Sequence, residues 1–167
     1  MLEKLRARMD RAEEGFTLIE LMVVVLIIAI LLAIAIPSFL GARGKAQDRA
    51  AQSNARNALT AEKTYYVDNQ AYGSDAALTA ANIEPSLTYV AGLTATQGSK
   101  EVGIVVADNG TVVGAIVCVT SVSANGSVFT VKDISAGLNA GTYFYKGAAA
   151  VGACDNTVAA GTWGPKW

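Results

Sequence analysis

An uninterrupted apolar run near the N-terminus limits what this chain can fold into. From Leu21 to Ile36 no side chain is polar, and the apolar segment as a whole extends from Phe16 to about Leu40. About 20 consecutive apolar residues are enough for a helix to cross the hydrocarbon of a bilayer. The segment is therefore predicted to be a helix that lies in a membrane or in an equally apolar protein environment.

One carboxylate stands at the front of this segment. Glu20 directly precedes the apolar run, whereas residues 1–15 are hydrophilic and mix basic with acidic side chains. A carboxylate costs about 2.5–3.5 kcal/mol at the centre of a membrane helix, and less near its end. A leucine would be cheaper at this position, so Glu20 calls for a specific role.

Two ordinary interpretations of the segment stay open at this point. A secretory signal peptide would be cut at the small-x-small site Ala33-Ile34-Ala35, but it would leave Glu20 without a role. A signal anchor would be retained in the membrane. Its orientation is not set by charge, because the bases of residues 1–15 compete with those of residues 43–49.

A third interpretation comes from a specific motif. The stretch Gly15-Phe16-Thr17-Leu18-Ile19-Glu20-Leu21-Met22-Val23-Val24 resembles the class III signal of type IV prepilins, and Pro37 with the polar stretch after it is similar to that family too. The resemblance implies cleavage between Gly15 and Phe16 by a prepilin peptidase, and N-methylation of the new Phe16 amine. It also implies that the apolar helix is retained and that Pro37 marks a kink. The leader departs from the family in ending with acidic residues where many members carry a base.

Cleavage after Gly15 would give Glu20 a partner. The new α-amino group of Phe16 lies about one helical turn before the carboxylate and has an unperturbed pKa near 8. Methylation to a secondary amine keeps this charge. We therefore expect a charge pair between Glu20 and the Phe16 amine of the same or a neighbouring subunit, and the resemblance implies that the pair sets subunit register during assembly.

The remainder is predicted to complete an α+β fold in which one long helix packs on an antiparallel sheet of about four strands. We expect four parts: a cleaved leader (1–15), a transmembrane or filament-core helix (16–40), an amphipathic helix half (41–73) and a head (74–167). On the helix, Ala55, Leu59 and Tyr66 form an apolar stripe. The predicted strands are residues 101–107, 111–121, 127–134 and 142–146, with a short one at 87–91, and Asn-Gly pairs favour hairpins between them.

The chain has two cysteines, Cys118 and Cys154, and both follow the apolar segment. An even number of cysteines in an exported domain favours one disulfide. Such a bond would hold an irregular C-terminal segment against the sheet, which resembles the C-terminal disulfide region of many type IV pilins. Both tryptophans lie in the C-terminal tail, where we expect them to pack on the head.

Composition argues against an enzyme. The chain contains no His, so a Ser/His/Asp set and the commonest transition-metal ligand are both missing. The glycines do not form a phosphate-binding loop, and a net charge of −1 without a basic cluster predicts no specific nucleic-acid site. The pair Asp155-Asn156 offers too few oxygen donors for a calcium site. We expect no catalytic residue, no metal and no cofactor.

These features predict a major structural subunit of a type IV pilus. Its expected partners are other pilin subunits, the prepilin peptidase, the pilus assembly machinery of the inner membrane, and membrane lipid before assembly. It would lie in the cytoplasmic membrane as a precursor and in an extracellular filament afterwards, with motility, attachment or DNA uptake as outputs. The alternatives are a minor pilin, a type II secretion pseudopilin and, in another class, a membrane-tethered or secreted binding module.

Overall fold

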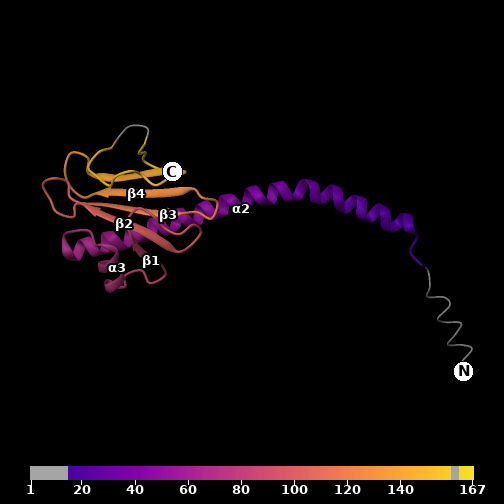
Figure 1. The fold of residues 1–167 in the computed structure, drawn as a ribbon, viewed down its shortest axis with the longest axis horizontal. Coiled ribbons are helices and arrows are strands. Elements are labelled where there is room, and N and C mark those ends of the chain that lie inside the picture. The colour runs from indigo at the N-terminus through magenta and orange to yellow at the C-terminus, as the bar shows by residue number, and fades with distance from the viewer. Residues whose placement is uncertain (1–14, 159–161) are drawn as a thin grey trace, which may run out of the picture. The chain divides into compact units, whose positions relative to one another are not determined.

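The computed structural model describes residues 15–158 and 162–167. The chain divides into two compact units, Met1–Ala42 and Arg43–Trp167, and each is described by itself. In chain order the elements are α2 (Leu18–Asn69), α3 (Asp75–Ala81), β1 (Thr88–Ala91), β2 (Glu101–Ala107), β3 (Ile116–Val122), β4 (Val128–Ile134) and β5 (Gly141–Gly147) (Figure 1). The α+β fold predicted from the sequence is confirmed.

Helix α2 continues through Pro37 and does not end at Ile36. A proline removes one backbone hydrogen bond, and the helix-forming residues on either side of it supply the bonds that keep α2 intact. The helix ends at Asn69 rather than near Gly73, because Gln70 takes the left-handed conformation with φ 57°. The glycine serves packing instead, since a Cβ at Gly73 would collide with the Leu78 side chain.

The sheet has five strands in the order β1-β2-β3-β4-β5, one more than the expected four. Strands β2 to β5 form the predicted antiparallel meander, whereas β1 pairs with β2 in parallel. The connection from β1 to β2 folds back over β2, where a Cβ at Gly103 would lie 2.5 Å from the Gly92 carbonyl oxygen and 2.7 Å from that of Thr94. A glycine at this position therefore allows the backbone crossing that makes the first pair parallel.

Strand β3 begins later than predicted, at Ile116 rather than near Thr111. In the preceding loop the Asp108 carboxylate accepts from Gly114 N at 2.7 Å, and the Asn109 side chain accepts from Thr111 N at 2.9 Å. These side chains take the backbone donors that a ladder would need, so the β-branched residues there remain in a loop.

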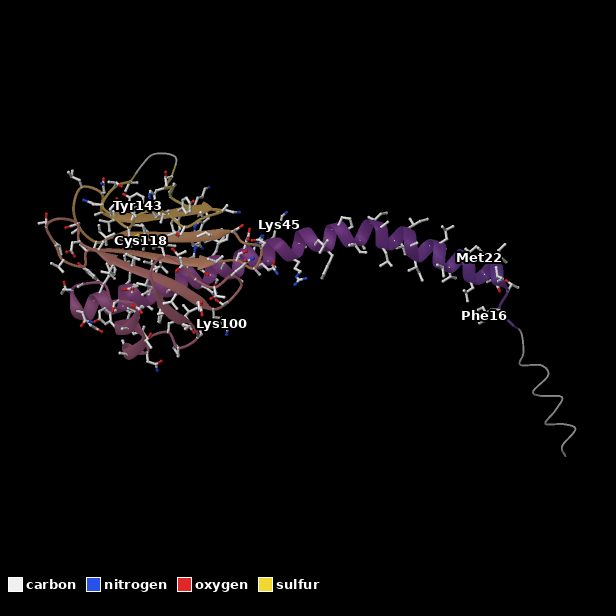
Figure 2. The ribbon with its side chains drawn as sticks, in the orientation of Figure 1. Phe16, Met22, Lys45, Lys100, Cys118 and Tyr143 are labelled. Atoms are coloured by element: carbon white, nitrogen blue, oxygen red, sulfur yellow. A yellow bond between two sulfur atoms is a disulfide. The ribbon has the colours of Figure 1, made fainter. Side chains whose placement is uncertain are left out.

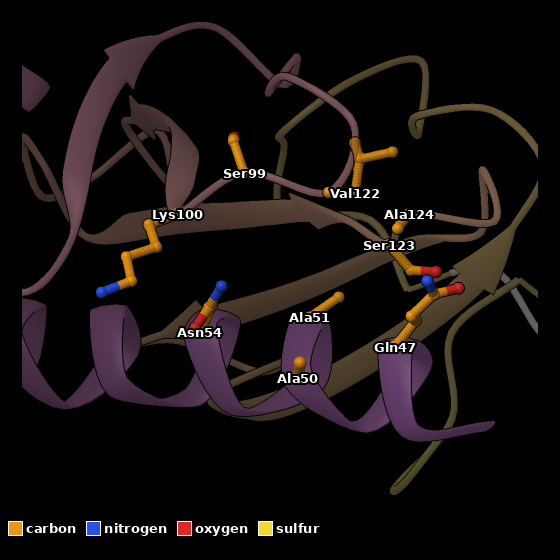
Figure 3. Close-up of a pocket in the computed structure, with 10 residues that line it drawn as sticks. Gln47, Ala50, Ala51, Asn54, Ser99, Lys100, Val122, Ser123 and Ala124 are labelled. Carbon is orange, nitrogen blue, oxygen red and sulfur yellow. The ribbon is translucent and has the colours of Figure 1, made fainter. Parts of the chain in front are cut away.

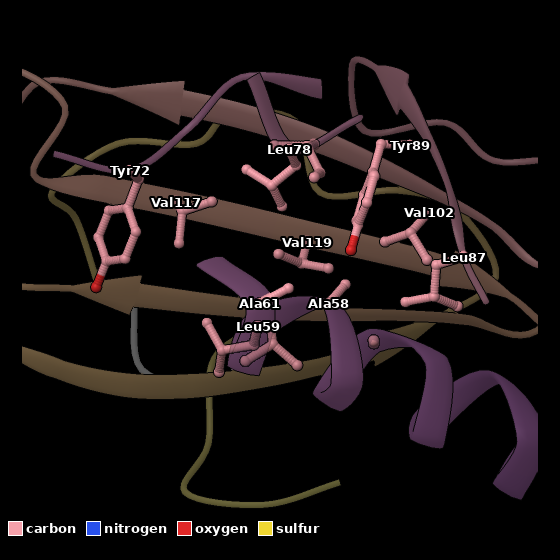
Figure 4. Close-up of a cluster of buried hydrophobic side chains, with 13 residues drawn as sticks. Ala58, Leu59, Ala61, Tyr72, Leu78, Leu87, Tyr89, Val102, Val117 and Val119 are labelled. Carbon is pink, nitrogen blue, oxygen red and sulfur yellow. The ribbon is translucent and has the colours of Figure 1, made fainter. Parts of the chain in front are cut away.

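One face of the sheet packs on the second half of α2. Ala55 and Ala58 are fully buried, and Val117, Val119 and Val131 meet them from the sheet (Figure 4). The predicted stripe is confirmed, because Ala55 and Leu59 belong to this core and Tyr66 packs against it.

The opposite face of the sheet is covered by the C-terminal segment. Cys118 alternates with the core valines of β3 and is bonded to Cys154, with 5.8 Å between the two Cα atoms (Figure 2). The predicted disulfide is therefore confirmed. The tail then pairs with the edge strand, since Phe144 and Gly164 exchange backbone hydrogen bonds of 2.8 and 2.9 Å. Beyond this pairing Trp167 lies on the side of the sheet that faces α2, because its ring packs edge-on against Phe144, with 4.9 Å between ring centroids, and Arg56 of α2 lies 5.0 Å from the ring centroid.

Removing the disulfide should destabilise the head. The bond joins residues 36 positions apart, and closure of such a loop is worth about 3–4 kcal/mol in the chain-entropy model. We expect Cys154→Ala to lower the free energy of unfolding by about this amount in denaturant titrations of the full chain in mild detergent. Wild-type protein treated with reductant is the control and should unfold at the same denaturant concentration as the variant. An unchanged midpoint for the variant would contradict the stabilising role of the bond.

Candidate functional site

The first half of α2 presents an exposed apolar surface. Every residue from 21 to 36 is exposed, and Leu21, Leu26 and Leu31 each expose about three fifths of their surface. The helix is long and apolar enough to cross a membrane. A surface of this kind in water would drive association, so it requires lipid or other protein around it.

Of the predicted residues, Gly15 and Phe16 directly precede α2, and Glu20 lies in its first turn. Figure 2 shows Phe16 at this end of the helix. Glu20 is held by a residue that the sequence argument did not use. Its Oε2 accepts a hydrogen bond from Thr17 N at 2.9 Å and another from Thr17 Oγ1 at 2.8 Å, while Glu20 N donates to Thr17 Oγ1 at 3.3 Å. This reciprocal arrangement is a capping box, which satisfies backbone donors at a helix N-terminus.

The capping box changes the interpretation of Glu20. The partner predicted from the sequence, the Phe16 amine, exists only after cleavage, whereas Thr17 already supplies two donors to Oε2. Both bonds involve the same oxygen, which leaves Oε1 for a further donor. Among residues 15–158 and 162–167 no base forms an ion pair with Glu20. The cap therefore satisfies hydrogen bonds but does not neutralise the charge. The spacing Thr-x-x-Glu before an apolar run could have revealed it from sequence alone.

The other predicted site residues lie elsewhere. Pro37 is within α2, and the two cysteines belong to the unit that begins at Arg43. Residues 1–14 lie outside the described part of the chain, so leader cleavage stays a prediction. The kink at Pro37 stays a prediction as well, although the helix is continuous there.

Glu62 is a buried acid on the core-facing side of α2. Its side chain is fully buried, and Oε2 accepts a hydrogen bond from Gly73 N at 2.9 Å. Within the described residues Oε1 has no hydrogen-bond partner. Burial raises the pKa of Glu62 to about 8, although the bond from Gly73 acts in the opposite direction. The carboxyl group therefore carries a proton at neutral pH and joins α2 to the segment that follows it.

A second buried acid joins the helix to the sheet. Asp133 in β4 accepts hydrogen bonds from the hydroxyl groups of Tyr72 and Thr142, and its Oδ1 lies 3.0 Å from Lys63 Nζ. The three partners come from α2, from the segment after it and from β5. This acid is therefore satisfied by structural contacts, and none of them resembles a nucleophile activated by a base.

Lys132 fixes the C-terminal segment on the outer face of the sheet. Its side chain is fully buried, and Nζ donates to the carbonyl oxygens of Asp155 at 3.0 Å and Thr157 at 2.6 Å. The Trp163 ring covers the ammonium at 4.3 Å. Burial lowers the pKa of Lys132, and the nearby Asp155 carboxylate opposes that shift. The Asp155 carboxylate, one of the two donors considered for calcium, therefore lies 3.8 Å from a lysine of the same chain.

A groove runs between α2 and the base of the sheet. It encloses about 230 Å³ and is lined on the helix by Gln47, Ala50, Ala51 and Asn54, and opposite by residues 98–100 and 122–124 (Figure 3). Among its described lining residues Lys100 alone carries a charge. The groove can form hydrogen bonds but offers no acid–base pair for catalysis.

No group of three His, Cys, Asp or Glu side chains gathers into a metal-binding cluster within residues 15–158 and 162–167. The acids of the head instead contact hydroxyl groups, backbone donors or single bases. What remains as a candidate functional surface is the exposed apolar part of α2 with Glu20 at its front.

The comparisons with known proteins agree with this site. Residues 10–36 match the family model described as the prokaryotic N-terminal methylation motif. The chain is 43% identical over 67 residues to the type IV wide pilus major component PilA4 of Thermus thermophilus, and 41% identical over 66 residues to the type IV major pilin protein PilA of Myxococcus xanthus. No solved structure matches the chain.

Each match covers 40% of this chain, and it spans 51% of the Thermus thermophilus protein and 30% of the Myxococcus xanthus protein. Over that stretch the chain is homologous to type IV pilins, as the resemblance of the N-terminal motif indicated. By their names, one relative is a major component of a type IV pilus and the other is a major pilin.

Replacement of Glu62 should change how stability depends on pH. The folded pKa of about 8 lies above the ordinary value of 4.5, so the folded state binds the proton more tightly. Stability from this group is therefore present at low pH and is lost as pH rises from about 4.5 to 8, by about 4 kcal/mol. We expect Glu62→Gln to remove this loss in urea unfolding of the full chain in mild detergent between pH 5 and 9.

Asp68→Asn is the matched control for Glu62→Gln, because Asp68 is an exposed acid on the same helix. The control should keep the wild-type pH dependence. If the Glu62 variant also keeps it, the buried acid is ionised throughout this range.

Proposed function

We propose that the protein is the major structural subunit of a type IV pilus. Residues 16–40 would hold the subunit in the cytoplasmic membrane and then pack against the same segments of other subunits in an extracellular filament. The observation that carries this proposal is the combination at the start of α2: an exposed apolar helix that begins with a single capped carboxylate, inside a methylation motif. Homology to two major pilus components supports the same conclusion.

The proposed maturation uses the first residues of α2. A prepilin peptidase would cut between Gly15 and Phe16, and the new amine of Phe16 would be methylated. Gly15 precedes α2 and has open space around its Cα, and the Phe16 side chain is 88% exposed. Both features leave this peptide bond accessible to an enzyme. The other proposed partners are the assembly machinery of the inner membrane and further copies of the subunit.

Maturation would also complete the environment of Glu20. In an apolar filament core an uncompensated carboxylate is strongly disfavoured, and removing one partner of a buried ion pair costs about 3–5 kcal/mol. Thr17 occupies Oε2, so the Phe16 amine of the same or an adjacent subunit would bind at Oε1. The amine is a cation only after cleavage, which makes processing a condition for assembly.

Two of the alternatives fit the chain less well. A type II secretion pseudopilin shares the N-terminal motif, but the named relatives are pilus components and the head has a disulfide that holds its C-terminal segment. A secreted binding module, cut after Ala35, would discard the motif altogether. Motility, attachment and DNA uptake would be outputs of the assembled filament.

The N-terminus of the mature protein tests the proposed maturation. Intact-mass and peptide mass spectrometry of the protein from its native membrane should give a chain that begins with N-methylated Phe16. A mature chain that begins at Ile36 would identify a cleaved signal peptide, and one that retains Met1 would exclude processing. Either result would contradict the pilin proposal.

Two substitutions of Glu20 separate its charge from its cap. Glu20→Gln keeps an oxygen that can accept from Thr17, whereas Glu20→Ala removes both the cap and the charge. We expect both variants to insert into the membrane and to lose filaments by roughly tenfold or more, because the proposed pair needs the charge. The measurement is the amount of subunit in sheared filaments relative to the membrane pool. Wild-type filament yield from Glu20→Gln would show that the cap alone suffices.

A further inference from the structure

We propose that Arg43, Lys45 and Arg49 form a basic collar that binds anionic phospholipid headgroups while the subunit waits in the membrane. The inference rests on the proposed function, because it takes residues 16–40 as the membrane-embedded segment. The partner is a lipid surface with phosphate groups of net negative charge. We use the name collar for these three residues only.

Chain connectivity places the collar at the membrane surface. Arg43 is three residues beyond Leu40, and three residues span at most about 11 Å when fully extended. The collar belongs to α2, in which residue 49 lies about 9 Å beyond residue 43 along the helix axis. The headgroup region of one leaflet is about 5–7.5 Å thick. Long Lys and Arg side chains extend their charged ends toward such a layer.

The collar side chains are available for this contact. All three residues are exposed, and none takes part in an ion pair among the residues that the structure describes. Lys45 and Arg49 are four residues apart and share one side of the helix, whereas Arg43 lies on another side. Positive charge therefore lies on two sides of the helix at this level and can meet more than one headgroup at once. Figure 2 shows Lys45 close to the point where α2 meets the head.

The neighbouring acid does not neutralise the collar. Between Glu20 and Glu62 the sequence contains one acid, Asp48. Its Oδ1 accepts from Ser123 Oγ at 2.8 Å, and its Oδ2 lies 3.5 Å from Lys146 Nζ. Asp48 is thus turned toward the sheet and already has a cation beside it. The collar keeps its full positive charge.

The distribution of charge favours lipid over other polyanions. The chain has a net charge of −1, and these bases are concentrated next to the apolar segment. A nucleic-acid surface would need a basic face that extends over the head. At an anionic membrane each nearby Lys or Arg strengthens attraction about fivefold, and the effect decays within a Debye length of about 8 Å. Residues next to the bilayer are within that range.

Lipid selectivity of the full-length chain in vesicles tests the proposal. The protein is reconstituted in phosphatidylcholine vesicles with trace spin-labelled phosphatidylglycerol or phosphatidylcholine, and electron paramagnetic resonance measures the motionally restricted fraction. We expect wild type to prefer phosphatidylglycerol severalfold. The variant R43Q/K45Q/R49Q should lose most of that preference, and 1 M salt should reduce wild type to the level of the variant. The bases of residues 1–15 are common to all proteins and contribute a constant background.

Two variants serve as matched controls. R43K/R49K keeps the charge and should keep the preference, and Lys166→Gln removes an exposed base at the far end of the sequence and should have no effect. An unchanged preference in the triple variant would overturn the proposal. If the triple variant loses filaments, or loses binding to duplex DNA in a gel-shift assay, while its lipid preference stays at the wild-type level, the proposal is also overturned.

Failure of the collar can be told apart from failure of the proposed function. Alkaline extraction of the vesicles shows whether the chain is embedded. A chain that is removed by alkali would overturn both proposals, because residues 16–40 would not be a membrane segment. A chain that resists extraction but shows no lipid preference would overturn the collar alone.

Discussion

One carboxylate at the edge of an apolar helix constrains what can surround that helix. Glu20 precedes sixteen residues without a polar side chain, Leu21 to Ile36, and all of them are exposed in the isolated subunit. Thr17 satisfies one carboxylate oxygen and caps the helix, but it cannot supply a positive charge. Any environment that covers the apolar surface must therefore also neutralise Glu20. In the proposed function this requirement would connect processing of the leader, the start of α2 and assembly of subunits, because a freed Phe16 amine would meet it at the right depth.

In the head, buried polar groups hold irregular segments against the regular ones. Glu62 receives the backbone donor of Gly73 after the helix, and Lys132 donates to the carbonyl oxygens of Asp155 and Thr157 beyond the last strand. A buried polar group is costly unless it is hydrogen-bonded, so each of these contacts specifies one position for a connecting segment. The disulfide at Cys118 acts on the same C-terminal segment from β3. These buried polar groups and the disulfide therefore serve to hold the fold of the head.

Patterns in short stretches of the sequence predicted those features that do not depend on contacts between distant residues. The length of the apolar run, the Ala-rich stripe and the β-branched runs led to the long helix and the antiparallel part of the sheet. The short strand β1 was predicted at residues 87–91, but its parallel pairing with β2 could not be foreseen, because the pairing depends on a backbone crossing at Gly103. The late start of β3 depends on how Asp108 and Asn109 bind the loop backbone. Burial of Glu62 and Lys132 needs tertiary contacts, whereas the Thr17–Glu20 cap was readable from its spacing.

The most direct test of the account is helical reconstruction by electron cryomicroscopy of filaments sheared from the cell surface, with the subunit identified by its peptides. We predict filaments built from this chain, with residues 21–36 in the core and the carboxylate of Glu20 within hydrogen-bond distance of a Phe16 amine. A filament in which residues 21–36 face solvent, or in which Glu20 lies far from every amine, would contradict it.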